Sequence, residues 1–178
     1  MFVACYHSKT QIMHSKKQLL AQYVLHCRWF VNVLEGFTDE ETNERINADM
    51  NHVKYLAGHL LNAQYAFAQI AGITVTRKWD ELFAGQGKSK ARDNFPYPSI
   101  DEIKATWDQL YPVVKSALEK MPEEALQKEL PASPVAGHGI LDSTVGDLWA
   151  FLNLHQAYHI GQIGILRRGF KKDPMKYF

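Results

Sequence analysis

A chain of 178 residues, 46% hydrophobic and 22% charged, has the composition of an ordinary globular domain rather than of a fibrous or disordered protein. Its formal net charge of +1 argues against binding nucleic acid through a basic surface. No apolar run approaches the roughly 18 residues of a membrane span. We therefore expect a single domain over residues 1–178, with no nucleic-acid or membrane partner.

The two cysteines, Cys5 and Cys27, are too few for a disulfide framework or a thiolate zinc site. The N-terminal residues also lack the apolar run of a secretion signal. We therefore expect a reducing, cytoplasmic location, in which Cys27 is an inert buried thiol.

The first predicted helix spans residues 8–34. Its apolar residues recur mostly at steps of three and four, which places them on one helix face, and Gly36 is expected to end the helix. The polar and acidic stretch 37–48 is predicted to be a connection.

A second helix is predicted to begin at Asp49 or Asn51 as N-cap and to run to Gly72. Its buried stripe includes His59, and His52 shares that face two turns earlier. Residues 73–98 show no helical periodicity. A connection of this length allows the second and third helices to be neighbours without being antiparallel.

The third helix is predicted to open with a capping box, Ser99 to Glu102, and to run to about residue 120. Pro112 lies inside it and is expected to kink or split it. A short acidic turn follows, and then a link rich in glycine and proline in which we expect His138 to be exposed.

The fourth helix, residues 143–169, carries the clearest chemistry. Ser143 or Thr144 is the expected N-cap, and Gly169 is expected at the position after the last helical residue. His155 and His159 are four residues apart, so both imidazoles lie on one face, within an apolar stripe that points into a core.

Four predicted helices, with no convincing strand and no internal repeat, indicate an all-α fold. We expect a four-helix bundle with a long connection between the second and third helices. Residues 171–178 are expected to form a tail on its surface, held by Tyr177 and Phe178.

Two imidazoles that point into an apolar core need a partner, and a metal ion is the partner we favour. His59 is the expected third ligand because it too lies mid-helix. His52 is the reserve ligand, since the start of a helix is more accessible to solvent. Three protein ligands leave a position for water or substrate, which is the pattern of catalytic sites. Gln162, Asn62 and Tyr158 are expected to support the ligands or line the pocket.

A simpler interpretation stays open at this point. The chain has eight histidines, so a chance pair four residues apart is unsurprising, and a buried histidine usually only forms hydrogen bonds. A helix with two histidines also lacks the extra residue that makes the HExxH motif diagnostic. Spacing alone therefore does not decide between a metal site and three core histidines.

The segments AGHLLNAQ and HQAYHIGQIGILRR, on a four-helix chain of this length, resemble the DinB/YfiT-like superfamily of helical-bundle metalloenzymes. The resemblance implies a divalent metal held by one histidine of the second helix and two of the fourth, which correspond to His59, His155 and His159. Nickel or zinc is the expected metal, and these ligands also permit iron or manganese. The resemblance further implies a homodimer.

Relatives in this family include transferases that join a low-molecular-weight thiol to an electrophile. The resemblance therefore implies a thiol-dependent S-transferase or related detoxification enzyme, whose substrates are a small-molecule electrophile and such a thiol. A branch of sulfoxide synthases has Glu where this chain has Gly161, which argues against that activity. No general base can be named from the sequence.

Two alternatives remain. One is a non-catalytic dimeric helical module with a structural or vestigial metal, which predicts an occluded site. The other is a metal-dependent hydrolase, which needs a general base; the fourth helix offers no Asp or Glu at a useful spacing.

Overall fold

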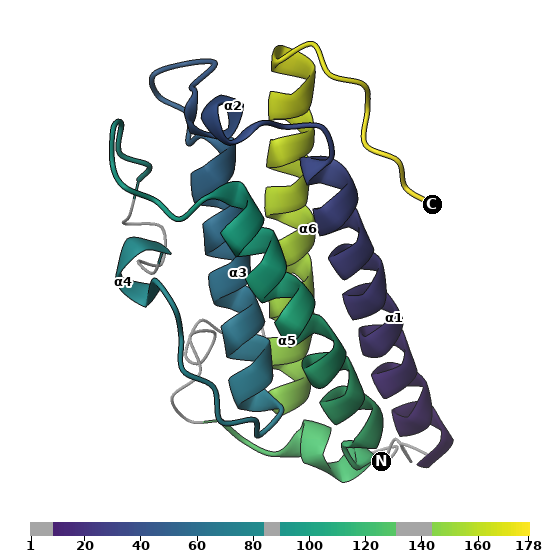
Figure 1. The fold of residues 1–178 in the computed structure, drawn as a ribbon. Helices are drawn as coiled ribbons and strands as arrows, with labels where there is room; N and C mark the ends of the chain where they lie inside the picture. The colour runs from purple at the N-terminus through teal and green to yellow at the C-terminus, as the bar shows by residue number, and fades with distance from the viewer. Residues whose placement is uncertain (1–8, 84–89, 131–143) are drawn as a thin grey trace, which may run out of the picture.

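The computed structural model describes residues 9–83, 90–130 and 144–178, with side chains from residue 15 onward. Four long helices lie side by side (Figure 1). Within the described ranges there is no strand beyond an isolated bridge between Glu129 and Thr144, so the prediction of an all-α fold is confirmed. The long helices are α1 (Lys9–Leu34), α3 (Val53–Ile70), α5 (Ile100–Lys120) and α6 (Val145–Gly169), and the short elements are α2 (Asp39–Asn43), α4 (Asp80–Phe83) and η1 (Glu123–Gln127).

Contacts at the helix ends establish the directions of the four long helices. Lys16, near the start of α1, donates to the carbonyls of Glu119 and Met121 at the end of α5, at 3.2 and 2.8 Å. Arg167, near the end of α6, donates to the carbonyl of Val33 at the end of α1, at 3.0 Å. Asp39 pairs with Lys54 at the start of α3 and accepts from the backbone N–H of Ile100 at the start of α5, at 2.7 Å in each case. Thus α1 and α6 run in one direction and α3 and α5 in the other (Figure 1). The connection between α3 and α5 carries the chain back along the molecule (Figure 1).

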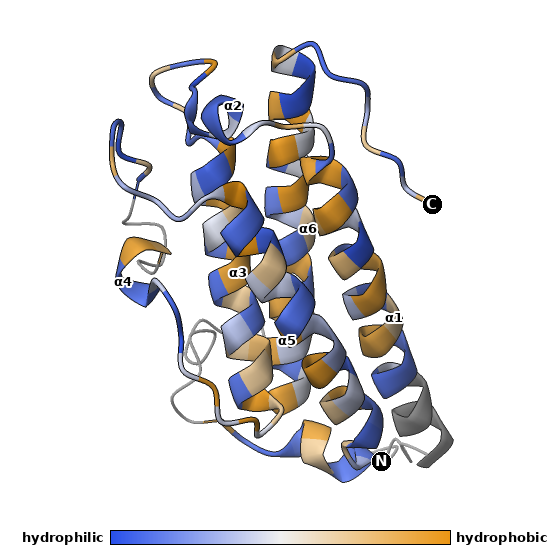
Figure 2. Ribbon diagram, viewed as in Figure 1, coloured by the Kyte–Doolittle hydropathy of each residue, from blue (hydrophilic) through white to orange (hydrophobic). Residues whose placement is uncertain are grey.

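Hydrophobic residues recur along each of the four long helices (Figure 2), and the largest meet in an aromatic core. Phe30 of α1 stacks on Trp107 of α5, with ring centroids 3.7 Å apart. Tyr23 meets the rings of Phe67 and Trp149 edge-on, at 5.1 and 5.7 Å. Aromatic rings therefore join all four long helices, because these five residues come from α1, α3, α5 and α6.

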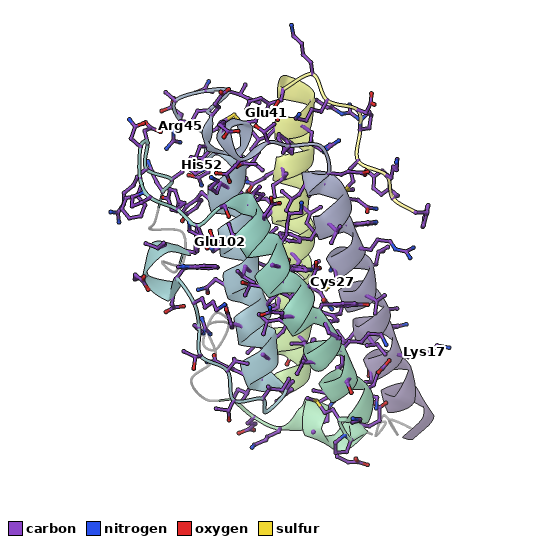
Figure 3. The ribbon with its side chains drawn as sticks, viewed as in Figure 1. Lys17, Cys27, Glu41, Arg45, His52 and Glu102 are labelled. Atoms are coloured by element: carbon purple, nitrogen blue, oxygen red, sulfur yellow. The ribbon has the colours of Figure 1, made fainter. Side chains whose placement is uncertain are left out.

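Cys27 lies near the middle of the arrangement (Figure 3) and is a free, buried cysteine. Gln64 donates to its sulfur at 3.4 Å and accepts a hydrogen bond from the hydroxyl of Tyr23 at 2.8 Å. Burial raises the pKa of the Cys27 thiol to about 12. The thiol is therefore protonated at neutral pH and has the low reactivity expected of a buried cysteine.

Local sequence signals set two helix starts as predicted. Ser99 and Glu102 form a reciprocal capping box at the start of α5. Thr144 and Asp147 form the same motif at the start of α6, so Thr144 rather than Ser143 is the N-cap. Gly36 follows α1 with φ 75°, a left-handed conformation that glycine adopts without strain.

The expected role of Gly169 is wrong. It is the last residue of α6, and the left-handed residue beyond the helix is Lys171, with φ 57°. A Cβ atom on Gly169 would lie 2.0 Å from Cδ1 of Ile46. The side chain of Ile46 thus packs directly on the helix end at this glycine, and a larger residue would have to displace it.

Two further expectations are corrected by the structure. Of the two effects expected of Pro112, a kink or a split, the split does not occur, since α5 is continuous from Ile100 to Lys120. Pro112 is exposed, so water can solvate the carbonyl left without its helical partner. The stretch 37–48 is also more than a connection, because a capping box formed by Thr38 and Glu41 starts the short helix α2.

His52 differs most from its prediction. It is the N-cap of α3 in place of Asp49 or Asn51, and its Nδ1 accepts the backbone N–H of Tyr55 at 3.0 Å. Its side chain is buried, with 1% exposed, because the ring of Tyr97 packs against it at 5.3 Å. Figure 3 shows it beside Arg45. The expectation of easy solvent access is therefore wrong.

The C-terminal residues form a surface tail that lies on α1. Trp29 donates to the carbonyl of Tyr177 at 3.2 Å, and Asn32 donates to that of Lys176 at 2.8 Å. The rings of Trp29 and Tyr177 also meet edge-on. Phe178 is almost fully exposed and does not hold the tail. Among the helices of the described ranges, none has the length and apolar character needed to cross a membrane.

We predict that His52→Asn flattens the acid dependence of stability. Burial lowers the pKa of His52 from 6.5 to about 4, and the positive Arg45 adds to the effect. Between those values the unfolded chain binds a proton that the folded chain excludes, so stability is lost as the pH falls through this window. Asparagine keeps the N-cap acceptor without taking up a proton. Urea unfolding from pH 7 to 4 tests this, and parallel curves for the parent and the variant would contradict it.

Candidate metal centre

Three histidines meet where α3 and α6 pack together. The ligand nitrogens of His59, His155 and His159 all lie within 4.8 Å of one another. The two Nε2 atoms of His59 and His155 are 2.9 Å apart, and the three ring centroids are 4.5 to 4.8 Å apart. Each of the three side chains is partly exposed. The structure thus brings together the three histidines predicted from the sequence.

The register of α6 against α3 is fixed next to this group. The side-chain amide of Gln156 donates to the backbone carbonyl of Leu60 at 3.2 Å, and Gln156 is buried. These two residues directly follow His155 and His59 in the chain. A slip of one helix along the other would leave a buried amide without its acceptor, so the hydrogen bond holds the imidazoles level with each other.

A backbone carbonyl orients His59. Nδ1 of His59 lies 3.0 Å from the carbonyl oxygen of Phe83 in α4. A carbonyl only accepts, so Nδ1 carries the proton and Nε2 keeps its electron pair for the centre of the group. A backbone carbonyl that accepts from the outer nitrogen is a common support for a metal-binding histidine.

Gly58 makes this contact possible. A Cβ atom at this position would lie 2.2 Å from the ring of Phe83. Since only glycine at position 58 leaves room, the Phe83 ring packs directly on α3. The backbone carbonyl of Phe83 can then reach His59. Figure 1 shows α4 in this position, outside the four long helices and beside α3.

Gln162 orients the second of the three histidines. Its Oε1 lies 2.6 Å from Nδ1 of His159, so Nδ1 donates and Nε2 is left as the electron-pair donor. His155 completes the pattern, because the unprotonated Nε2 of His59 requires a proton on the facing Nε2 of His155. Its own Nδ1 is then a buried nitrogen without a hydrogen-bond partner among the described residues.

The histidines of α6 are neutral at pH 7. Burial lowers the pKa of His155 to about 3, with the neighbouring His59 and His159 adding to the effect. Burial also lowers the pKa of His159, against the opposite effect of its hydrogen bond to Gln162. Both imidazoles are therefore uncharged at neutral pH, and the uncharged imidazole is the form that binds a metal.

The other predicted residues lie differently. Asn62 donates to Asp80 at 2.6 Å and accepts from Arg77 at 3.1 Å, so it ties the start of α4 to α3 rather than touching the imidazoles. Tyr158 is 64% exposed, and its ring lies 5.0 Å from that of His159 on the outer side. His52 does not belong to the histidine group.

Aromatic side chains surround the group. The ring of Tyr55 is parallel to that of His59 at 6.3 Å, and Phe151 lies 6.2 Å from His155. Within the parts of the chain that the structure describes, no Asp or Glu belongs to the group. The sequence did not predict that the Phe83 carbonyl orients His59 or that the Gln156 amide fixes the register of α6. A glycine in the middle of a helix, Gly58, was the one sign in the sequence that another segment packs there.

These residues fit a divalent metal ion. Three ring nitrogens face one another, and those of His59 and His159 are unprotonated, with the outer nitrogen held by an acceptor. Nε2 of His155 would join them as a ligand once its proton moves to Nδ1. None of the three carries a negative charge that would favour a hard cation. The group leaves part of its surface to solvent. Among the residues that the structure describes, it therefore has three ligands, the number found in open catalytic sites, rather than the four of a closed structural site.

Comparison with known proteins agrees with this description. A family model described as the DinB superfamily matches residues 20–163, which include α3, most of α6 and all three histidines. No curated protein matches the chain.

We predict that Gly58→Ala weakens zinc binding roughly 10–100-fold, the usual cost of losing a group that orients a ligand. The added methyl group displaces the Phe83 ring and, with it, the carbonyl that holds His59. Competition with a chromogenic chelator measures the affinity. Gly164→Ala is the matched control, because its Cβ would meet no atom within 4 Å. Equal zinc affinities for the two variants would contradict this role of Gly58.

Proposed function

The chain belongs to the DinB superfamily, and from this membership and the histidine group we propose that it is a metal-dependent enzyme that joins a low-molecular-weight thiol to a small electrophile. The observation that carries the proposal is the convergence of three imidazole nitrogens, without a carboxylate, at a partly exposed place. The thiol chemistry rests on the resemblance to thiol-dependent transferases.

His59, His155 and His159 would hold the metal through the nitrogens that face one another. A divalent ion there, nickel or zinc first and iron or manganese next, would act as a Lewis acid that favours the thiolate form of a bound thiol. The Phe83 carbonyl and Gln162 keep two of the imidazoles in the required tautomer.

The reaction that we propose balances without a further reactant. The sulfur of the thiol forms a bond to the electrophilic carbon, the leaving group departs with the electron pair of its bond, and the thiol proton passes to solvent. The partly exposed ring of Phe151 beside His155 offers apolar surface for the electrophile. Its role is to hold the electrophile close to the sulfur and to limit the access of water.

The two alternatives are less well supported. A non-catalytic module with a vestigial metal predicts an occluded site, whereas all three histidines are partly exposed. Hydrolysis requires a general base, and no carboxylate belongs to the group in the described parts of the chain. We also propose a cytoplasmic location, with which the free thiol of Cys27 is compatible.

We predict about one divalent metal ion per chain in untagged protein, and its loss in His59→Ala and in His155→Ala. Elemental analysis of the three proteins measures the metal directly. His52→Asn is the control, since this histidine lies outside the group and the variant should keep the metal. A parent protein that holds no metal after incubation with zinc and nickel would leave three core histidines and overturn the site.

We predict that the metal-loaded protein conjugates monochlorobimane to a small thiol, and that His155→Ala lowers the rate at least about tenfold. The fluorescence of the product measures the rate, and His52→Asn again serves as the control. If His155→Ala turns over as fast as the parent, the thiol mechanism fails. The metal site itself is judged by the elemental analysis, so the two proposals fail independently.

A further inference from the structure

A cavity of about 390 Å³ lies between the C-terminal tail and the end of α1. It is lined by residues of the tail between 171 and 176, by residues of the last turn of α1 with Gly36, and by Arg167 of α6. Figure 1 shows the tail leaving α6 and running beside α1. Arg167 lies eight residues beyond His159, which is about 12 Å along a helix. The cavity is therefore separate from the histidine group, and its volume is that of a site for a small molecule.

Arg167 brings a buried positive charge to this cavity. The residue is 6% exposed. Its Nε donates to the backbone carbonyl of Asp173, and its Nη1 donates to those of Val33 and Glu35. Its Nη2 has no hydrogen-bond partner among the described residues and is open to solvent. A guanidinium group that three carbonyls hold in place therefore has two N–H groups left for a molecule in the cavity.

Lysine side chains add to this charge. Lys171 and Lys176 line the cavity, and neither ammonium group has an ion-pair partner in the part of the chain that the structure describes. Lys172 also lines it, but pairs with Glu41 at 2.8 Å. Residues 167–178 carry five of the 20 basic side chains of the chain and one of its 19 acidic ones. Positive charge is thus concentrated at the end of a chain whose formal net charge is only +1.

Two features of the cavity oppose an anion. Glu35 and Asp173 are among its lining residues, and α1 and α6 both end beside it with carbonyls that carry partial negative charge. Both carboxylates belong to exposed residues, so water can solvate them. The last carbonyls of α1 accept from Arg167 and Lys172, and those of α6 accept from the backbone N–H groups of residues 170–172. These hydrogen bonds offset the charge of the helix ends and leave the unused cationic groups as the main attraction.

We propose that this cavity binds the phosphate group of a small organic molecule. A phosphate monoester carries a charge of about −1.5 to −2 at pH 7 and has three acceptor oxygens. These suit the two N–H groups on Nη2 of Arg167 together with the unpaired ammonium groups of Lys171 and Lys176. A carboxylate would bring one negative charge and two oxygens, and would leave part of this set unused. The volume of the cavity leaves room for an organic part beside the phosphate.

Nuclear magnetic resonance of the ¹⁵N-labelled full chain tests the site, with glycerol phosphate, inorganic phosphate and acetate titrated at constant ionic strength. Glycerol phosphate is expected to cause saturable shifts of the Arg167 Nε–H signal and of the backbone N–H signals of residues 171–176. Acetate is expected to bind at least about tenfold more weakly. The absence of saturable shifts would overturn the site, and acetate that binds as tightly as glycerol phosphate would overturn the preference for phosphate. Inorganic phosphate that binds as tightly would overturn the organic part of the ligand.

Two double variants with the same change of charge test the lysines. Lys171→Gln with Lys176→Gln is expected to weaken the binding of glycerol phosphate about tenfold. Lys120→Gln with Lys128→Gln is the matched control, because these exposed lysines lie near the end of α5, at the other end of α1 from the cavity. Arg167 stays in place in both, since it also holds the ends of α1 and α6 together. Equal affinities for the two double variants would overturn the proposal.

A third variant separates this site from the histidine group. A phosphate bound to a metal there would depend on the ligands of that metal, whereas the cavity shares no residue with the group. His155→Ala is therefore expected to keep the shifts of residues 171–176 with the parent's affinity. Loss of those shifts in His155→Ala would overturn a separate phosphate site. The proposal does not rest on the proposed function, and thermal unfolding confirms that each variant is folded.

Discussion

The histidine group depends on the register between α3 and α6. Neither helix alone brings three imidazoles together, since α6 supplies two and α3 supplies one. The buried hydrogen bond from Gln156 to the carbonyl of Leu60 holds the two helices level, one residue away from the facing histidines. A helix shifted by one turn would move about 5.4 Å, which is more than the distances within the group. The chemistry of the site is therefore a consequence of how two helices pack.

The long connection between α3 and α5 has a structural reason and a chemical one. Because α3 and α5 run in the same direction, the chain must return along the molecule before α5 can begin (Figure 1). On its way it packs Phe83 against Gly58 and presents a carbonyl to His59. Asn62 and Arg77 meet Asp80 at the start of α4 and so fix this segment on α3. The connection that the parallel directions of α3 and α5 require thus also supplies the Phe83 carbonyl, which sets the tautomer of His59.

The sequence predicted what local rules decide. The capping box at Ser99 and an N-cap at Ser143 or Thr144 follow from local side chains, and the shared face of His155 and His159 follows from helix periodicity. Features that depend on distant segments were missed. His52 is buried because Tyr97 packs over it, and the side chain of Ile46 packs on Gly169. His59 is held by a backbone carbonyl, which no side chain in the sequence indicates. Contacts of this kind become visible only in three dimensions.

The stacked rings of Phe30 and Trp107 join α1 to α5, the two long helices that contribute no histidine to the group. This contact, which fixes the two helices that carry no ligand, thus involves no residue of the histidine group. We therefore expect substitutions at the histidines to leave this half of the fold packed, so that the same arrangement of helices can carry a different set of ligands.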